Sequence, residues 1–464
     1  MEILMKGFSV GNFKSFNDLQ SISFATSKIT KHPTHIYKTK KGKYLKSAIV
    51  FGANASGKSN LIKAISFSRD IILKGLNNVN ISGNHFRINE KSYNEPAIFQ
   101  YDFIMDNQEY LYGFTLSYAR GVIENEWLIR VNESNEFRIF ERSLNDQSLS
   151  EVETDYNHKK EYEKFFSYLD DFSSDIAKPL MEKTILADIA TRSKPTEEPF
   201  KYIKNLYDYI SDMIIIFPDT KYNFINDVGM LSEKKDFFEN ILKYFDTGIE
   251  SLTSQKEEMN LNKLFYLMNL EIGKDQKAEI SRLSSKHPIR YRLGDQIYTI
   301  RKKKNGRLVC NKLLMNHGND EALFELADES DGTKRLFDLI PLLKDNGNPR
   351  IIIIDEIDRS LHTNLIKQFI QLFFEMHANN CVQLLATAQD SNILDLKLLR
   401  QDEIWFVERQ VDHSSTIYSL NEFKERSDKD VQKDYLLGRY GAVPFFINSL
   451  QAEIEKVNEE KDKV

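Results

Sequence analysis

The chain has 464 residues, enough to bury a large core, and its 63 Lys and Arg residues against 69 Asp and Glu residues give a net charge of −6. This balance argues against a globally basic nucleic-acid-binding protein and leaves only local basic patches as candidates. The two cysteines, Cys310 and Cys381, lack metal-ligand spacing and exclude a disulfide framework, which suits a reducing compartment. Neither a signal-like N-terminus nor an apolar run of about 18 residues occurs, so we expect a cytoplasmic protein with no membrane partner.

The N-terminal part of the chain predicts strands that lead into a glycine-bracketed loop. Alternating apolar residues between Gly7 and Phe24 predict two short strands. The stretch from Ile49 to Asn60 then reads IVFGANASGKSN and has the G-x-x-x-x-G-K-S spacing of a phosphate-binding P-loop. Its glycines let successive N–H groups converge on a phosphate chain at the positive end of the next helix. The alternative is an ordinary glycine turn that opens a helix.

The P-loop reading gives each residue of the loop an expected role. Lys58 is expected to reach the β- and γ-phosphates, and the Ser59 hydroxyl is expected to bind Mg²⁺. Binding of ATP or GTP together with Mg²⁺ is therefore the starting hypothesis. The loop residues expected to bind the nucleotide are Gly52, Asn54, Ser56, Gly57, Lys58, Ser59 and Asn60.

The remaining patterns predict an α/β protein. Aromatic and β-branched runs from about residue 86 to 140 indicate an antiparallel meander, and helical spacing from 151 to 286 indicates a compact helical insertion. Apolar strands then alternate with helices, as in a mainly parallel sheet covered on both faces. Among them we expect a buried strand over Arg350–Ile354 and a helix over Thr363–Met376. The expected division is an N-terminal lobe, the insertion, a C-terminal lobe and a helical tail, at residues 1–145, 146–286, 287–425 and 426–464.

A second motif follows the P-loop by some 300 residues. Four isoleucines, Ile351 to Ile354, precede Asp355 and Glu356 and form a candidate Walker B strand. Such a strand would lift Asp355 to the carboxyl edge of the sheet, where it can hold Mg²⁺ through water. Glu356 would then face the γ-phosphate and orient or deprotonate the attacking water. The alternative is ordinary capping at a strand end.

Between these motifs, Ser330-Asp331-Gly332-Thr333 opens a predicted helix. It offers a hydroxyl, a close-approaching backbone and a helix N-terminus, all of which suit an anion. A plain Ser/Asp helix cap is the competing interpretation.

The order and spacing of five motifs resemble the ABC-class ATPase heads of SMC-like proteins, and most closely the stand-alone bacterial ATPases of the abortive-infection and OLD type. The resemblance covers about residues 1–120 and 285–445. It implies an ABC-type P-loop NTPase head that sandwiches ATP between two subunits. The motifs are residues 12–16, 52–59, 330–333, 355–362 and 438–444.

The resemblance also assigns expected roles to residues at the subunit interface. Ser330 and Gly332 would contact the γ-phosphate bound to the P-loop of the other subunit, and Asp358 would couple the two sites. One position departs from the family pattern, because Gln389 stands where the family has a switch histidine. An amide can hydrogen-bond a phosphate or a water molecule but cannot carry a positive charge, so we expect slow hydrolysis.

The sequence thus predicts an ATPase with Glu356, Lys58 and Gln389 as catalytic residues. The resemblance implies that it dimerises or oligomerises and acts as sensor or regulator in anti-phage defence. The resemblance implies a separately encoded effector, a nuclease or toxin. The alternatives are a nucleotide-gated binding protein with little hydrolysis and the motor subunit of a transporter. Two basic segments, 38–46 and 301–307, are candidates for DNA contact, although solvated lysines explain them as well.

Overall fold

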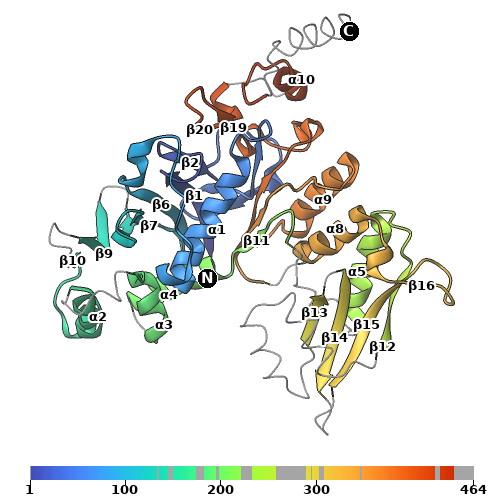
Figure 1. Ribbon diagram of the computed structural model, residues 1–464, viewed down its shortest axis with the longest axis horizontal. Helices are drawn as coiled ribbons and strands as arrows, with labels where there is room; N and C mark the ends of the chain where they lie inside the picture. The colour runs from blue at the N-terminus through green and yellow to red at the C-terminus, as the bar shows by residue number, and fades with distance from the viewer. Residues whose placement is uncertain are drawn as a thin grey trace, which may run out of the picture.

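The computed structural model describes residues 2–132, 135–144, 150–173, 182–194, 198–220, 232–257, 289–293, 295–302, 308–344, 347–423 and 429–443. Its centre is a six-stranded sheet of order β11-β17-β18-β5-β19-β20 (Figure 1). Neighbouring strands are parallel except for the last pair. The strands are β5 (Ser47–Phe51), β11 (Ile214–Ile216), β17 (Arg350–Ile354), β18 (Val382–Thr387), β19 (Ile404–Arg409) and β20 (Ser415–Ser419).

The strands of this core sheet are apolar on both faces. In β5, Ala48 and Val50 belong to one apolar core, whereas Ile49 and Phe51 belong to another. The isoleucines of β17 divide between the two cores in the same alternating way. Because successive side chains of a strand point to opposite faces, a continuous apolar run is what a sheet covered on both sides requires.

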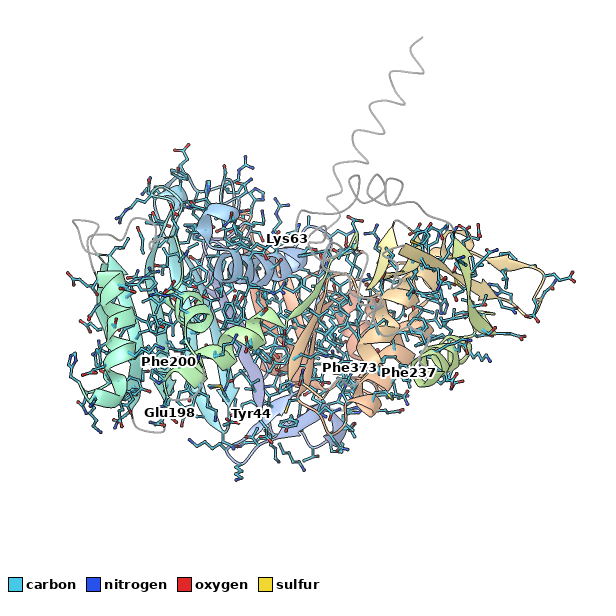
Figure 2. All side chains as sticks on the ribbon, turned by 90° about the horizontal axis from the view of Figure 1, so that it is seen from below. Tyr44, Lys63, Glu198, Phe200, Phe237 and Phe373 are labelled. Atoms are coloured by element: carbon cyan, nitrogen blue, oxygen red, sulfur yellow. The ribbon has the colours of Figure 1, made fainter. Side chains whose placement is uncertain are left out.

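Helices cover the two faces of the core sheet. Helix α1 (Lys58–Lys74) contributes to the first core, and α8 (Asp331–Leu339) and α9 (Thr363–Met376) contribute to the second. Figure 1 shows α1 on one side of the molecule's centre and α8 and α9 on the other. In Figure 2, the labelled Phe200 and Phe373 mark the first and the second core.

A seven-stranded antiparallel sheet of order β10-β9-β8-β7-β6-β1-β2 packs on the other side of α1. Its centre is the predicted meander, and β1 and β2 are the two predicted N-terminal strands. The strands are β1 (Ile3–Gly11), β2 (Gln20–Ser23), β6 (Ala97–Met105), β7 (Gln108–Ser117), β8 (Val122–Val131), β9 (Glu136–Leu144) and β10 (Ser150–Glu153).

The segment predicted as a helical insertion is not helical throughout. Its helices are α2 (Glu163–Ser173), α3 (Ile185–Arg192), α4 (Phe200–Ser211) and α5 (Ser232–Tyr244). Strand β11 lies within the same segment, yet it pairs in parallel with β17 in the core sheet. The domain boundaries at 146 and 286 therefore stay a prediction.

A third sheet and a hairpin complete the described chain. The five-stranded sheet has the order β12-β15-β14-β13, with β16 paired to β15. Of the predicted C-terminal tail, residues 444–464 lie outside the described residues. The elements are β12 (Ser251–Glu257), β13 (Ile289–Leu293), β14 (Gln296–Lys302), β15 (Leu308–Asn316), β16 (Leu323–Phe324), the hairpin β3 (Ile36–Lys38) and β4 (Lys43–Leu45), and α10 (Val431–Leu436).

The prediction that segment 38–46 contacts DNA is wrong for its last residue. Lys46 is fully buried, and its ammonium donates hydrogen bonds to the carbonyl oxygens of His377 (2.7 Å) and Ala378 (2.5 Å). The Lys46 side chain is therefore not accessible to a DNA phosphate group. In the second segment, residues 303–307 lie outside the described residues.

Within the described ranges, no helix combines the length and the apolar character needed to cross a bilayer.

Candidate nucleotide site

The loop between β5 and α1 requires glycine at two positions. A Cβ atom on Gly52 would lie 2.3 Å from the carbonyl oxygen of Val407. Gly57 has a φ of 111°, and a Cβ atom there would lie 2.3 Å from Ser415 Oγ. Glycine has no Cβ atom and readily adopts a left-handed backbone, so it avoids both clashes. Steric packing therefore explains why the motif has glycine at these two positions.

Lys58, the first residue of α1, points back into this loop. Its ammonium donates hydrogen bonds to the carbonyl oxygens of Gly52 (2.7 Å) and Ala53 (3.0 Å). Burial lowers the pKa of Lys58, and nearby carboxylates, Asp355 first among them, oppose that shift. The residue is thus a buried cation held at the positive end of a helix, an environment that favours an anionic ligand.

The two predicted Mg²⁺ ligands meet although nearly 300 residues separate them. Ser59 Oγ lies 3.0 Å from Asp355 Oδ1. The same carboxylate oxygen accepts a hydrogen bond from Thr387 Oγ1 at 2.7 Å. The Asp355 backbone N–H donates to the carbonyl oxygen of Ile216 in β11 at 2.8 Å, which holds the end of β17 in place. Sheet pairing therefore delivers Asp355 to the first turn of α1.

Glu356 is held at the edge of the cavity by contacts from three directions. Its backbone is left-handed, with a φ of 51°, and its N–H donates to Thr387 Oγ1 at 2.8 Å. Its carbonyl oxygen accepts a bond of 3.4 Å from Arg335 Nη2 of α8. Its carboxylate oxygen Oε1 accepts a bond of 2.8 Å from Gln389 Nε2. A left-handed non-glycine residue is held in a strained conformation by its surroundings, which is common at functional sites.

The P-loop, Glu356 and Gln389 line one cavity of about 500 Å³. Lys63, on the second turn of α1, joins the predicted residues in its wall, and Figure 2 labels this residue. The lining residues are Asn54, Ala55, Ser56, Gly57, Lys58, Ser59, Asn60, Lys63, Glu356 and Gln389.

The donor set of this cavity fits a nucleoside triphosphate with Mg²⁺. Ser56 Oγ is buried, and within the part of the chain that the structure describes it has no hydrogen-bond partner, so it can serve a ligand. Lys58 supplies a cation, and Ser59 with Asp355 offers two oxygen ligands. Mg²⁺ is commonly held by one or two such protein oxygens together with phosphate and water.

Five predicted site residues do not line this cavity within one chain. Gly52 and Asp355 lie outside the lining but contact Lys58 and Ser59, whereas the other three are Ser330, Gly332 and Asp358. Ser330 caps α8, because its Oγ accepts a hydrogen bond of 3.1 Å from the Thr333 N–H, and Gly332 follows in the first turn. Asp358 instead accepts hydrogen bonds from the backbone N–H groups of Gln389 (2.8 Å) and Asp390 (2.5 Å). Their roles toward a second subunit stay predictions.

Sequence reasoning did not identify Thr387, which links the Walker B residues, or the contacts that brace the P-loop. Thr387 is the last residue of β18, which pairs in parallel with β17. Because parallel neighbouring strands end at the same edge of a sheet, the predicted parallel sheet could have placed Thr387 beside Asp355. Ser15 Oγ accepts a bond of 2.8 Å from Asn60 Nδ2, and Ser415 Oγ donates to the carbonyl oxygen of Ser56 at 2.5 Å. The second contact comes from a strand that no motif marks.

Comparison with known proteins gives one family and a set of solved structures. Residues 47–395 match the family described as "AAA domain, putative AbiEii toxin, Type IV TA system". No curated protein matches the chain.

The similar solved structures include SMC heads. The SMC head domain from Thermotoga maritima is 14% identical, with 90% of this chain and 98% of that chain covered and a TM-score of 0.33. The Smc head domain with an extended coiled coil from Pyrococcus furiosus, bound to the C-terminal domain of ScpA, is 14% identical, with 91% and 100% covered and a TM-score of 0.39. The Smc head domain with a coiled coil and joint from Pyrococcus yayanosii is 12% identical, with 91% and 100% covered and a TM-score of 0.35.

Proposed function

The chain belongs to the AAA-domain family that its residues 47–395 match, and from that premise we propose that it hydrolyses ATP slowly between two copies of itself and regulates a separately encoded effector. The chain is an SMC-like, ABC-class P-loop ATPase of the abortive-infection context. The observation that carries the proposal is the 3.0 Å contact between Ser59 and Asp355, with Glu356 beside it in the cavity wall.

Each side chain of the cavity has a distinct part in the proposed reaction. Lys58 and the P-loop N–H groups bind and orient the phosphates, and Ser59 and Asp355 hold Mg²⁺. When bound, the metal ion supplies charge stabilisation on the transferred phosphoryl group. Glu356 positions the attacking water and accepts its proton, and Gln389 orients the Glu356 carboxylate through the 2.8 Å hydrogen bond.

The placement of the signature residues supports a two-chain site. Ser330 and Asp331 are exposed at the start of α8, and they do not line the cavity of their own chain. An exposed helix N-terminus is suited to an anion that another molecule presents. Dimerisation would bring this surface over the P-loop cavity of the second copy.

Mixing two inactive variants tests the two-chain site. Lys58→Ala removes the phosphate-binding cation, and Ser330→Arg blocks the signature surface; each variant alone is expected to lose ATP turnover. A 1:1 mixture is expected to regain about a quarter of the wild-type activity, because half of the dimers are mixed and each mixed dimer has one intact site. A mixture that stays inactive while both variants fold as the wild type does would contradict the two-chain site.

Glu356→Gln tests hydrolysis itself. We expect this variant to retain ATP binding, to lose turnover, and to accumulate as an ATP-dependent dimer in light-scattering measurements. Turnover at the wild-type rate would refute the role of Glu356.

The regulatory role is supported by the family's description, which names a toxin and a toxin–antitoxin system. Co-expression with the protein encoded beside it tests this role. The expected result is a complex whose effector activity depends on the nucleotide state, so that Lys58→Ala and Glu356→Gln shift the activity in opposite directions. Identical effector activity with both variants would refute control by nucleotide.

A second function, a nucleotide-gated binding protein with little hydrolysis, is favoured by one contact. The Gln389 amide occupies one oxygen of the Glu356 carboxylate and cannot become a cation. ATP-dependent dimerisation without measurable phosphate release by the wild-type chain would select this function.

A further inference from the structure

A second cavity of about 680 Å³ lies apart from the P-loop, and the two cavities share no lining residue. Its volume lies within the range of about 300–1,000 Å³ that is usual for small-molecule sites. Three chain segments form it, namely the loop that precedes β3, the segment after Gln389, and the start of α10. The lining residues are Lys31, His32, Leu394, Asp395, Leu396, Lys397, Lys429, Asp430, Val431 and Gln432.

Cationic side chains dominate the polar part of this second cavity. Lys31, Lys397 and Lys429 line it, and the Lys429 ammonium lies 2.9 Å from Asp434 Oδ2. Lys397 is exposed and has no ion-pair partner among the described residues. Lysines gathered from separate segments around one hollow provide the point charges that phosphate groups bind.

The two carboxylates in the wall are already engaged. Asp395 Oδ2 lies 3.6 Å from the Lys367 ammonium, and Asp395 Oδ1 accepts the Lys397 N–H at 2.8 Å. Asp430 Oδ1 caps α10 by accepting the Lys433 N–H at 3.0 Å. The wall thus carries three lysines against two carboxylates, and one of these carboxylates is also paired with Lys367 outside the wall, so positive charge is in excess.

His32 stands in this wall in a strained conformation. Its φ of 51° and ψ of 62° are left-handed, which is uncommon for a residue other than glycine. Its ring Nε2 bonds the carbonyl oxygen of Leu396 at 3.0 Å, and its ring stacks on that of His35 with centroids 4.9 Å apart. Because the carbonyl oxygen can only accept, Nε2 carries the hydrogen and the ring orientation is set.

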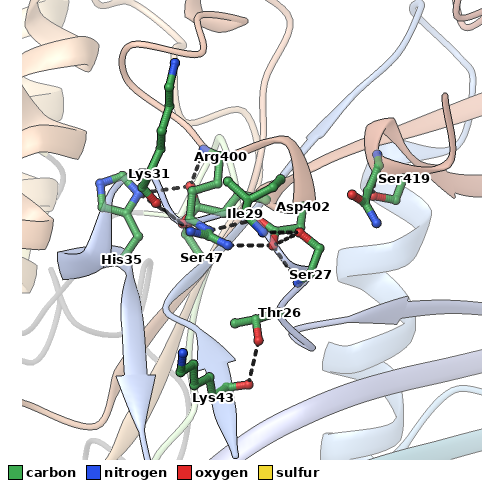
Figure 3. A network of polar contacts seen from close by, with 12 residues as sticks. Thr26, Ser27, Ile29, Lys31, His35, Lys43, Ser47, Arg400, Asp402 and Ser419 are labelled. Atoms are coloured by element: carbon green, nitrogen blue, oxygen red, sulfur yellow. Dashed lines mark hydrogen bonds and ion pairs between the residues drawn. The ribbon is translucent and has the colours of Figure 1, made fainter. Parts of the chain in front are cut away.

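A buried polar network contacts the chain segment that carries Lys31 (Figure 3). Arg400 Nη1 donates to the carbonyl oxygen of Lys31 at 2.5 Å and pairs with Asp402 at 2.8 Å. His35 Nδ1 lies 2.9 Å from Glu403, which also accepts from Ser47 Oγ at 2.9 Å. The network holds the Lys31 segment against the starts of β5 and β19, so the cavity is built on fixed elements.

We propose that this second cavity binds a small phosphorylated molecule. The lysines contact its phosphates, and Leu394, Leu396 and Val431 supply an apolar surface for the rest of the molecule. Gln432 Nε2 donates to Asn392 Oδ1 at 2.7 Å, which connects the cavity to the segment that follows Gln389.

Binding is tested with inorganic tripolyphosphate by calorimetry on the full chain carrying Lys58→Ala, so that failure of the proposed ATPase function does not affect the result. We expect one binding site. Adding Lys397→Glu is expected to weaken the affinity about tenfold, because the substitution removes one favourable charge interaction with the phosphates and adds an unfavourable one. Lys201→Glu, at an exposed position outside both cavities, is the matched control and leaves the affinity unchanged.

Three outcomes would overturn the proposal. They are the absence of binding to the Lys58→Ala chain, equal affinity with and without Lys397→Glu, and equal weakening by Lys201→Glu. A DNA duplex that binds more tightly than tripolyphosphate and with the same dependence on Lys397 would also overturn it, in favour of a nucleic-acid surface. Thermal melting of each variant verifies that the chain is folded.

Discussion

Gln389→Ala is expected to lower the rate of ATP hydrolysis without changing the concentration of ATP that half-saturates the enzyme. The substitution removes the 2.8 Å hydrogen bond from Gln389 Nε2 to Glu356 Oε1. Lys58 and the P-loop N–H groups, which are proposed to bind the phosphates, are left intact. The change therefore acts on the orientation of Glu356 and leaves substrate binding alone.

The size of the effect follows from the exposure of the pair. A hydrogen bond to a charged group contributes about 1.5–3 kcal/mol, and solvent at the exposed Gln389 reduces this to roughly 1 kcal/mol. Because about 1.4 kcal/mol corresponds to a factor of ten, we expect kcat to fall by about three- to tenfold. Gln389→His restores a donor at this position and is expected to recover the rate.

Steady-state phosphate release over a range of ATP concentrations measures both parameters. Gln371→Ala is the matched control, because Gln371 Nε2 donates to Glu375 Oε1 at 3.0 Å on the exposed face of α9, away from the cavity. The reasoning fails if Gln389→Ala hydrolyses ATP at the wild-type rate, or if Gln371→Ala lowers the rate equally.

Three further predictions follow from buried contacts. Thr387→Val removes the hydroxyl between the Walker B aspartate and the next N–H, so ATP turnover is expected to fall by roughly tenfold or more, whereas Thr387→Ser retains it in the same phosphate assay. Burial lowers the pKa of Lys46 from 10.5 to about 8, so the folded chain binds fewer protons than the unfolded chain between these values. The stability of the wild type relative to Lys46→Met should therefore rise from pH 8 to pH 10.5 in urea unfolding, by up to about 3 kcal/mol, and a flat difference would contradict the shift. Arg142→Met leaves the buried Glu126 carboxylate without the cation at 3.1 Å and is expected to cost about 3–5 kcal/mol in the same unfolding measurement. Arg138→Ala removes only exposed ion pairs and is expected to cost less than about 1 kcal/mol; equal losses would refute the distinction.

Several elements of the fold were predictable because local pattern and tertiary environment agree. The apolar run of β17 and the amphipathic α9 begin and end at the predicted residues, Arg350–Ile354 and Thr363–Met376. An apolar β-branched run can only be buried on both faces, which is also its environment in the sheet. The predicted fold class, an ABC-type P-loop head with an antiparallel meander, is confirmed.

Other elements carried weaker local signals. Strand β11 has only three residues, and it sits within a stretch of helical spacing, so its place beside β17 depends on the partner strand. Lys46 belongs to a lysine-rich run and resembles its solvated neighbours in sequence, yet the two carbonyl oxygens that accept its hydrogens lie more than 300 residues away. Local sequence does not encode such distant partners.

The sequence by itself determined the phosphate-binding loop, the Walker B carboxylates and the two-sided sheet, because glycine sterics and apolar periodicity act over a few neighbouring residues. Only the tertiary structure decided that Ser59 meets Asp355, that Thr387 joins Asp355 to Glu356, and that a second, lysine-lined cavity exists. The physical reason is that these contacts join strands and loops that are remote in the chain, and their geometry is set by the pairing order of the core sheet.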